Sequence, residues 1–190
     1  AQADMMGMSS TEWSRYMHDV IGLSEPPEEI NAEVVRRMEA RYSERLPLIP
    51  GAVEAVERLA ESFRLGLASS SNRPLIDAVL SAAGLGSSFD VTVSSEEVER
   101  GKPAPDVFLE AARRLGVSPA RCAVVEDSGN GIRAAVAAGM RVVAIPNSLY
   151  RPPDDALSLA DVVIGSLADL SSKVVAGEDE SPGPPSSSPL

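Results

Sequence analysis

The stretch AVVEDSGNGIRAA, residues 123–135, decides the fold and raises the first question about function. A short apolar run ends at two adjacent carboxylates, Glu126 and Asp127, and a Ser-Gly-Asn-Gly segment then leads into a helix-like pattern. This order is typical of a buried strand that is followed directly by a helix. The paired acids allow two interpretations. They could hold a metal ion beside a phosphate, or they could belong to a plain turn in which Asp127 or Ser128 caps the helix.

Strand and helix patterns alternate on both sides of this stretch. The predicted elements, in chain order, are helix 51–62, strand 64–69, helix 73–84, strand 89–94, helix 105–116, strand 122–126, helix 131–139, strand 141–146 and strand 161–165. Short strands separated by helices predict an α/β fold with a doubly wound, Rossmann-like parallel sheet. Ligands of such sheets bind beyond the carboxyl ends of the strands.

A purely helical segment precedes this alternation. Residues 9–21 and 26–46 place apolar side chains at helical spacing, and a Pro- and Gly-containing break follows them. The last residues contain little that a core could bury. We therefore expect three regions: a partial helical cap over 1–47, an α/β core over 48–175 and a disordered tail over 176–190.

Charge and composition limit the partners that this chain can have. The 190 residues carry a net charge of −11 and include only two lysines, Lys102 and Lys173. Such a chain repels nucleic acid and anionic membrane, so we expect neither as a partner, whereas a local site can still bind a small phosphorylated metabolite. A single cysteine excludes a disulfide framework and a thiolate zinc site. With no long apolar run and no signal-peptide pattern, we expect a cytoplasmic protein that is a monomer or a weak oligomer.

Two further polar stretches fall where the carboxyl edge of the sheet should lie. Ser69, Ser70 and Asn72 follow the first predicted strand, and together with Arg73 they could bind a phosphate or merely cap the next helix. Lys102 stands on a loop stiffened by prolines, just ahead of a helix. An ammonium group held there suits the stabilisation of phosphoryl oxygens, although a solvated surface lysine is the ordinary alternative.

Taken together, Ser69, the segment GKPAPDVF that contains Lys102, and the segment VVEDSGNGIRAA resemble the haloacid dehalogenase (HAD) superfamily. The nearest group is similar to the beta-phosphoglucomutase-like phosphatases and mutases, and the resemblance covers residues 5–170. It implies a HAD-like core with a helical cap. It also implies that Ser69 binds phosphate, that Lys102 stabilises charge, and that Asp127 holds Mg²⁺ with Glu126. The implied reaction is phosphoryl transfer through an aspartyl-phosphate.

The sequence departs from that family at the nucleophile. Members carry a strand that ends in Asp-x-Asp-Gly ahead of the cap, but this sequence contains no such stretch, and Asp4 is the only acid before the cap helices. We therefore expect the first strand and both catalytic aspartates to lie outside this chain, which alone would be inactive. In the family layout that strand lies between the strands ending at Ser69 and Glu126, whose edges would be left unpaired.

The resemblance favours a Mg²⁺-dependent phosphatase that acts on a small phosphorylated metabolite such as a sugar phosphate. A phosphomutase is the alternative, but where mutases of this group carry an arginine after G-x-S, this sequence has Ser10. A second alternative is a non-catalytic relative that binds a phosphometabolite or a protein. The retention of Ser69, Lys102, Glu126 and Asp127 argues against that alternative.

Overall fold

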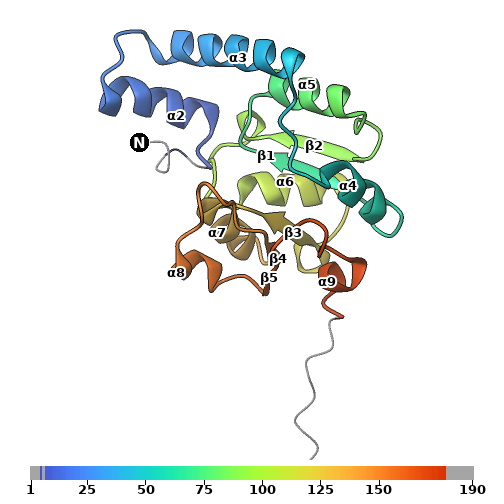
Figure 1. Cartoon of the computed structure of the whole chain (residues 1–190). Helices are drawn as coiled ribbons and strands as arrows, with labels where there is room; N and C mark the ends of the chain where they lie inside the picture. The colour runs from blue at the N-terminus through green and yellow to red at the C-terminus, as the bar shows by residue number, and fades with distance from the viewer. Residues whose placement is uncertain (1–4, 6, 179–190) are drawn as a thin grey trace, which may run out of the picture.

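Helices and parallel strands alternate along most of the chain in the computed structural model, which describes residues 5 and 7–178 (Figure 1). The helices are α2 (Ser10–Tyr16), α3 (Pro27–Glu44), α4 (Ala52–Ala60), α5 (Arg73–Ala83), α6 (Asp106–Leu115), α7 (Gly129–Ala137), α8 (Asp154–Leu157) and α9 (Ser172–Ala176). The tail predicted over 176–190 lies outside the described residues from 179 onward, as does Asp4. None of the described helices is both long and apolar enough to cross a membrane.

The described strands form two parallel sheets. In the first, β1 (Gly66–Ser69) pairs with β2 (Val91–Ser94). In the second, β4 (Arg141–Ala144) lies between β3 (Ala123–Glu126) and β5 (Val162–Val163). The parallel pairing confirms the predicted α/β class, and it brings the carboxyl ends of the strands in each sheet to one edge.

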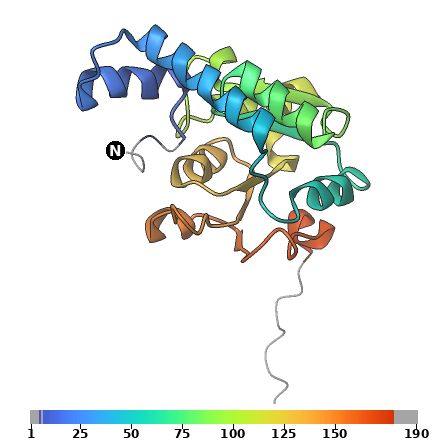
Figure 2. The ribbon, with the colours of Figure 1, turned by 45° about the horizontal axis from the view of Figure 1, so that its top comes forward.

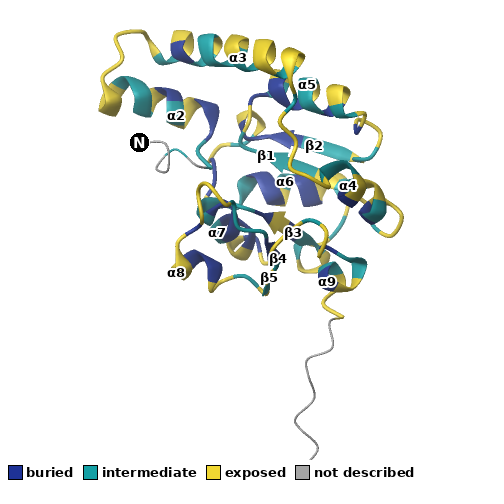
Figure 3. Ribbon diagram, viewed as in Figure 1, coloured by how far each residue is buried: buried dark blue, intermediate teal, exposed yellow. Residues whose placement is uncertain are grey.

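Helices cover both faces of these strands, as a doubly wound fold requires. On one face α6 and α7 pack against β2, β3 and β4, around side chains such as Val93, Val107 and Ile132 that have no exposed surface. On the opposite face α4, α5 and α9 cover β1 and β4 in two smaller clusters. Figure 3 shows the buried residues concentrated where these helices meet the strands.

A cavity of about 740 Å³ lies between the two sheets. Residues of β1 and β3 both line it, and α4, α6 and the segment around α9 supply apolar side chains to its walls. Val125, in the middle of β3, is 39% exposed, which is unusual for a strand of a parallel sheet. The edges of β1 and β3 therefore face an apolar space where a fully paired sheet would continue.

Helices α2 and α3, here called the helical pair, pack against each other at the carboxyl edge of β1. A capping box begins α2, because the Ser9 hydroxyl accepts from the Glu12 N–H while the Glu12 carboxylate accepts from the Ser9 N–H. A π-helical turn, Met17–Ile21, extends α2 before the chain reverses into α3. Figures 1 and 2 show α3 running alongside α5, so the helical pair rests on the core rather than standing free.

Candidate active site

A buried ion pair joins Lys102 to Glu126 at the carboxyl end of β3. Both side chains are less than 10% exposed, and the Lys102 ammonium contacts one carboxylate oxygen, Oε1, directly. Lys102 Nζ also lies 3.4 Å from the carbonyl oxygen of Ala68 and 4.5 Å above the centre of the Phe108 ring. The ammonium is thereby fixed between the ends of β1 and β3, so Lys102 is not the solvated surface lysine that the alternative interpretation required.

The second oxygen of Glu126, Oε2, is fully occupied by the loop that follows β3. It accepts from the N–H groups of Asp127 (3.0 Å) and Ser128 (3.1 Å) and from the Ser128 hydroxyl (3.0 Å). Burial by itself raises the pKa of Glu126, but the Lys102 charge and the bonds from Lys102 and Ser128 outweigh burial and lower the pKa below its ordinary value. Glu126 is therefore ionised and committed to holding Lys102 and the loop.

Glycine is required at position 131, where α7 passes the Glu126 carboxylate. A Cβ atom added to Gly131 would collide with that carboxylate. Ser128, and not Asp127, caps α7, because its hydroxyl oxygen accepts from the Gly131 N–H at 3.0 Å. The structure thus decides the capping question raised by the sequence and leaves the Asp127 carboxylate outside the helix cap.

Asp127 is partly exposed at the same edge and is held by a residue that sequence reasoning missed. Asn147 follows β4, and its Nδ2 donates to Asp127 Oδ2 at 3.2 Å. The side-chain oxygen of Asn147, Oδ1, accepts from the N–H groups of Leu149 (2.9 Å) and Tyr150 (3.2 Å), which fixes the orientation of the Asn147 amide. The sequence does offer one indication of this role: Asn147 lies just beyond the end of a predicted strand, where the functional side chains of such sheets are found.

The Ser69–Arg73 stretch begins beside the ion pair, but its side chains form contacts with different parts of the protein. Ser69 immediately follows Ala68, and its hydroxyl oxygen accepts from the Ser71 N–H at 3.1 Å. The Ser70 hydroxyl donates to the Gly7 carbonyl oxygen at 2.8 Å, toward the helical pair. The structure therefore keeps Ser69 near Lys102 and uses the Ser70 side chain for a contact with the N-terminal segment.

Asn72 and Arg73 are directed away from the ion pair. The Asn72 amide is 4% exposed and donates to Asn31 of α3 (3.0 Å) and to Glu96 (2.8 Å). Glu96 also accepts from the Arg73 N–H at 2.9 Å, so a carboxylate already occupies the N-terminus of α5. The Arg73 guanidinium binds Thr92 and Glu97 at the outer side of β2. These two side chains are not brought together with Ser69, Lys102 and Asp127.

The donor set for a metal at this edge is small. The described residues contain no group of three or more His, Cys, Asp or Glu side chains that could hold a metal ion. Mg²⁺ does not need such a group, because it is commonly bound through one or two carboxylates while it keeps several waters and takes substrate phosphate oxygens. Asp127 could take that role. The Glu126 carboxylate already accepts hydrogen bonds on both oxygens, so it is suited to fix the loop that carries Asp127.

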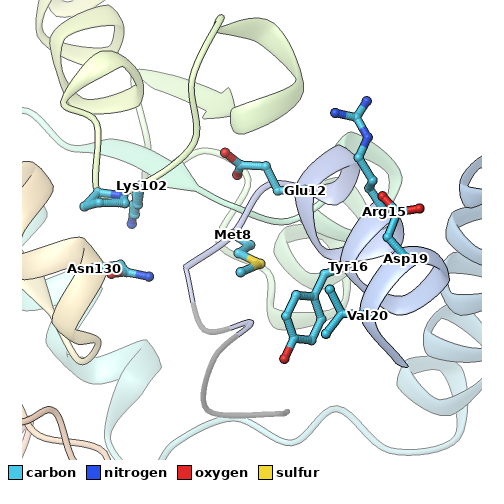
Figure 4. Close-up of a pocket in the computed structure, with 9 residues that line it drawn as sticks. Met8, Glu12, Arg15, Tyr16, Asp19, Val20, Lys102 and Asn130 are labelled. Carbon is cyan, nitrogen blue, oxygen red and sulfur yellow. The ribbon is translucent and has the colours of Figure 1, made fainter. Parts of the chain in front are cut away.

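A pocket of about 390 Å³ separates the helical pair from the ion pair (Figure 4). One wall is formed by Lys102, Pro103 and Asn130 of the core. The opposite wall comes from α2 and the segments next to it: Met8, Glu12, Arg15, Tyr16, Asp19 and Val20. One end of a small molecule bound in this pocket would lie beside Lys102, and the rest of the molecule would lie against the helical pair.

Comparison with known proteins identifies the family to which this geometry belongs. Residues 6–139 match the haloacid dehalogenase-like hydrolase family. This chain is a haloacid dehalogenase-like hydrolase. The match confirms the family resemblance and the hydrolase class expected from the sequence.

Individual relatives agree with the predicted subgroup. Hexitol phosphatase B of Escherichia coli is 41% identical over 150 residues, which cover 76% of this chain and 67% of that protein. The structure of CbbY from Rhodobacter sphaeroides with xylulose-1,5-bisphosphate has a TM-score of 0.77 at 28% identity and covers 89% of this chain and 77% of that one. A putative beta-phosphoglucomutase from Thermotoga maritima has a TM-score of 0.65 at 28% identity, covering 86% and 76% respectively.

Proposed function

We propose that this hydrolase is a phosphatase of small phosphorylated metabolites, with sugar phosphates or sugar-alcohol phosphates as its substrates. The observation that carries the proposal is the buried Lys102–Glu126 pair, which lies one residue from Asp127 and next to the end of β1 that carries Ser69. Lys102 also lines the pocket of about 390 Å³, and an ammonium group held at such a place suits the stabilisation of phosphoryl oxygens. The hexitol phosphatase activity named for a relative supports the same substrate class.

In this proposal the residues at the carboxyl edge have separate roles. Lys102 stabilises charge on the phosphoryl oxygens, Ser69 donates a hydroxyl hydrogen bond to them, and Glu126 positions Lys102. Asp127 would hold Mg²⁺, with Asn147 orienting its carboxylate. The bound ion would neutralise charge on the phosphate. The helical pair, within residues 1–47, acts as the cap over the 48–175 core and forms one wall of the pocket.

The nucleophile is the remaining part of the proposed site. We propose that a strand from outside the described residues enters the space between β1 and β3 and ends in the aspartate that attacks phosphorus. Its carboxylate oxygen would bond to phosphorus as the bond from phosphorus to the sugar oxygen breaks, and the second aspartate of the Asp-x-Asp-Gly strand would give that oxygen its proton. The same aspartate would then take a proton from the water that hydrolyses the aspartyl-phosphate, which releases phosphate and restores the first carboxylate. The apolar 740 Å³ cavity and the exposed Val125 support this placement, since both would be covered by such a strand.

A phosphatase is favoured over a phosphomutase by the surroundings of Ser10. In the resembling mutases this position carries an arginine for a second phosphate. Here Ser10 is 2% exposed, and its hydroxyl donates to Glu96 Oε1 at 3.1 Å, on the side of the core. That contact supports a structural role for position 10 rather than a role in gripping substrate.

The test is phosphate release from hexitol monophosphates in the presence of Mg²⁺. We would compare the 190-residue chain with the same chain preceded by an apolar strand that ends in Asp-x-Asp-Gly. The proposal expects turnover in the joined chain, none in the isolated chain, and none when the first aspartate of the added strand is changed to Asn. A joined, folded chain that binds phosphate without turnover would instead support the non-catalytic relative.

A further inference from the structure

Glu12 is fixed on the pocket wall opposite Lys102. Its Oε2 accepts from the Ser9 N–H and from the Ser9 hydroxyl, both at 2.7 Å, so the side chain is locked to the first turn of α2. A Cβ atom added to Gly101 would collide with the same oxygen, which places the carboxylate directly against the loop that carries Lys102. Glu12 is therefore a pre-positioned negative charge at the edge of the pocket.

The wall formed by the helical pair carries one net negative charge. Glu12 and Asp19 are acidic, and Arg15 is the basic residue of that wall. Figure 4 shows Arg15 and Asp19 beside each other, both farther from Lys102 and Asn130 than Glu12 is. On the core side the Lys102 charge is already balanced by Glu126. Any group of the substrate that points toward the helical pair therefore meets an acidic surface.

We infer that Glu12 is a specificity-determining residue that excludes substrates with a second phosphoryl group. The inference rests on the proposed function and narrows its substrate class to monophosphates whose remaining part is uncharged and rich in hydroxyl groups. A carboxylate accepts hydrogen bonds from hydroxyls and repels a phosphate dianion. Met8, Tyr16 and Val20 add apolar surface against which the carbon chain of such a substrate can lie.

The test is isothermal titration calorimetry on the full chain with Mg²⁺. The two probes are a hexitol monophosphate and the bisphosphate of the same hexitol, which differ only in the second phosphoryl group. Glu12→Gln removes the charge but keeps the capping box, because Gln serves at that helical position as well as Glu does. Wild type is expected to prefer the monophosphate, and Glu12→Gln to reduce that preference by about fivefold, the size expected for one partly screened charge nearby.

Two further variants complete the experiment: one is expected to shift the preference in the opposite direction, and the other is a control for net charge. Arg15→Gln makes the wall more negative and is expected to strengthen the preference for the monophosphate. Glu28→Gln alters the net charge by the same amount as Glu12→Gln, but at an exposed position of α3 outside the pocket lining, and is expected to leave the preference unchanged.

The possible failures are distinguishable. Equal affinity of wild type for the two probes, with no effect of Glu12→Gln, overturns this inference and leaves the proposed function standing. A bisphosphate affinity that depends on Arg15 also overturns it, because Arg15 would then grip the second phosphate. Binding of neither probe, either by this chain or by the joined chain whose first added aspartate is changed to Asn, overturns the proposed function, and this inference with it.

Discussion

We expect the Lys102 side chain to contribute to the stability of the fold, in addition to its proposed role at the phosphoryl oxygens. Replacing Lys102 by Met leaves the Glu126 carboxylate buried at the end of β3 without its counter-charge. Removing one partner of a buried pair costs about 3–5 kcal/mol, because the remaining charge has no compensation. We expect Lys102→Met to lower the free energy of unfolding by that amount, as measured by urea denaturation.

The matched control removes both charges. Lys102→Met combined with Glu126→Gln leaves no unpaired ion, so we expect the double variant to be more stable than Lys102→Met alone. Equal stability of the single and double variants would show that the pair is not desolvated in the way that its burial indicates.

Asn147 would act on the proposed metal site through Asp127, with which it forms a hydrogen bond. Removing its amide with Asn147→Ala frees the Asp127 carboxylate and the loop that Asn147 organises through Leu149 and Tyr150. Residues that orient a ligand from behind typically change metal affinity by about 10–100-fold. We expect calorimetry to show Mg²⁺ binding weakened by about tenfold, with no change for Ser148→Ala, an exposed neighbour in the same loop. An unchanged Mg²⁺ affinity of Asn147→Ala would contradict a role of Asn147 in orienting Asp127.

At the scale of elements, Glu97 ties β2 to two helices. Its carboxylate accepts from the Ser94 N–H at 2.8 Å and binds Arg73 of α5 and Arg114 of α6. Partial burial opposes ionisation, but the Ser94 bond and the two arginines together lower the pKa of Glu97 from 4.5 to about 2. A lowered pKa means that this contribution to stability is complete above the unfolded-state pKa and is lost as the pH falls through about 2.

Glu97→Gln should therefore destabilise the protein in a pH-dependent manner. We expect the difference between the urea midpoints of wild type and Glu97→Gln to be largest near neutral pH and to shrink at about pH 2.5. Glu99→Gln, an exposed carboxylate of the same segment, is the control and should change little at either pH. A difference that grows as the pH falls would contradict the assignment.

The elements that the sequence predicts well are those with a clear period and enough length. The runs 122–126 and 141–146 are apolar and β-branched, and the structure confirms a strand within each. The helices α8 and α9 have four and five residues, which is too short for a helical period to be visible, and neither was predicted. The observed ends of elements differ from the predicted ones by a few residues. Helix α7, for example, begins directly after its cap, Ser128, and not at residue 131 as predicted.

The candidate site was less accessible from sequence because its partners are remote along the chain. The sequence places Lys102 and Glu126 at the same edge of the sheet, but the ion pair between them is seen only in the structure. The use of Asn72 to bind Asn31 and Glu96 could not be predicted, since these contacts join residues 41 and 24 positions apart. Such contacts depend on how the helical pair rests on the core, which no local pattern encodes.

At the scale of the whole molecule, the cavity between β1 and β3 carries a testable energetic consequence. Filling it with a strand buries apolar side chains and pairs two free strand edges. We expect the joined chain to melt at least about 5 °C above a chain preceded by a Gly-Ser segment of equal length. Identical melting temperatures would mean that the added strand does not enter the cavity.

The most direct measurement of the central claim is Mg²⁺-dependent phosphate release by the joined chain carrying Asp127→Asn. The variant keeps the shape of the side chain, so its effect reports the lost charge. The control is Asp154→Asn, whose side chain is 94% exposed. The account predicts a loss of about 10²–10³-fold or more for Asp127→Asn and no loss for Asp154→Asn. Full activity in the Asp127→Asn variant would contradict a phosphatase site at this edge of the sheet.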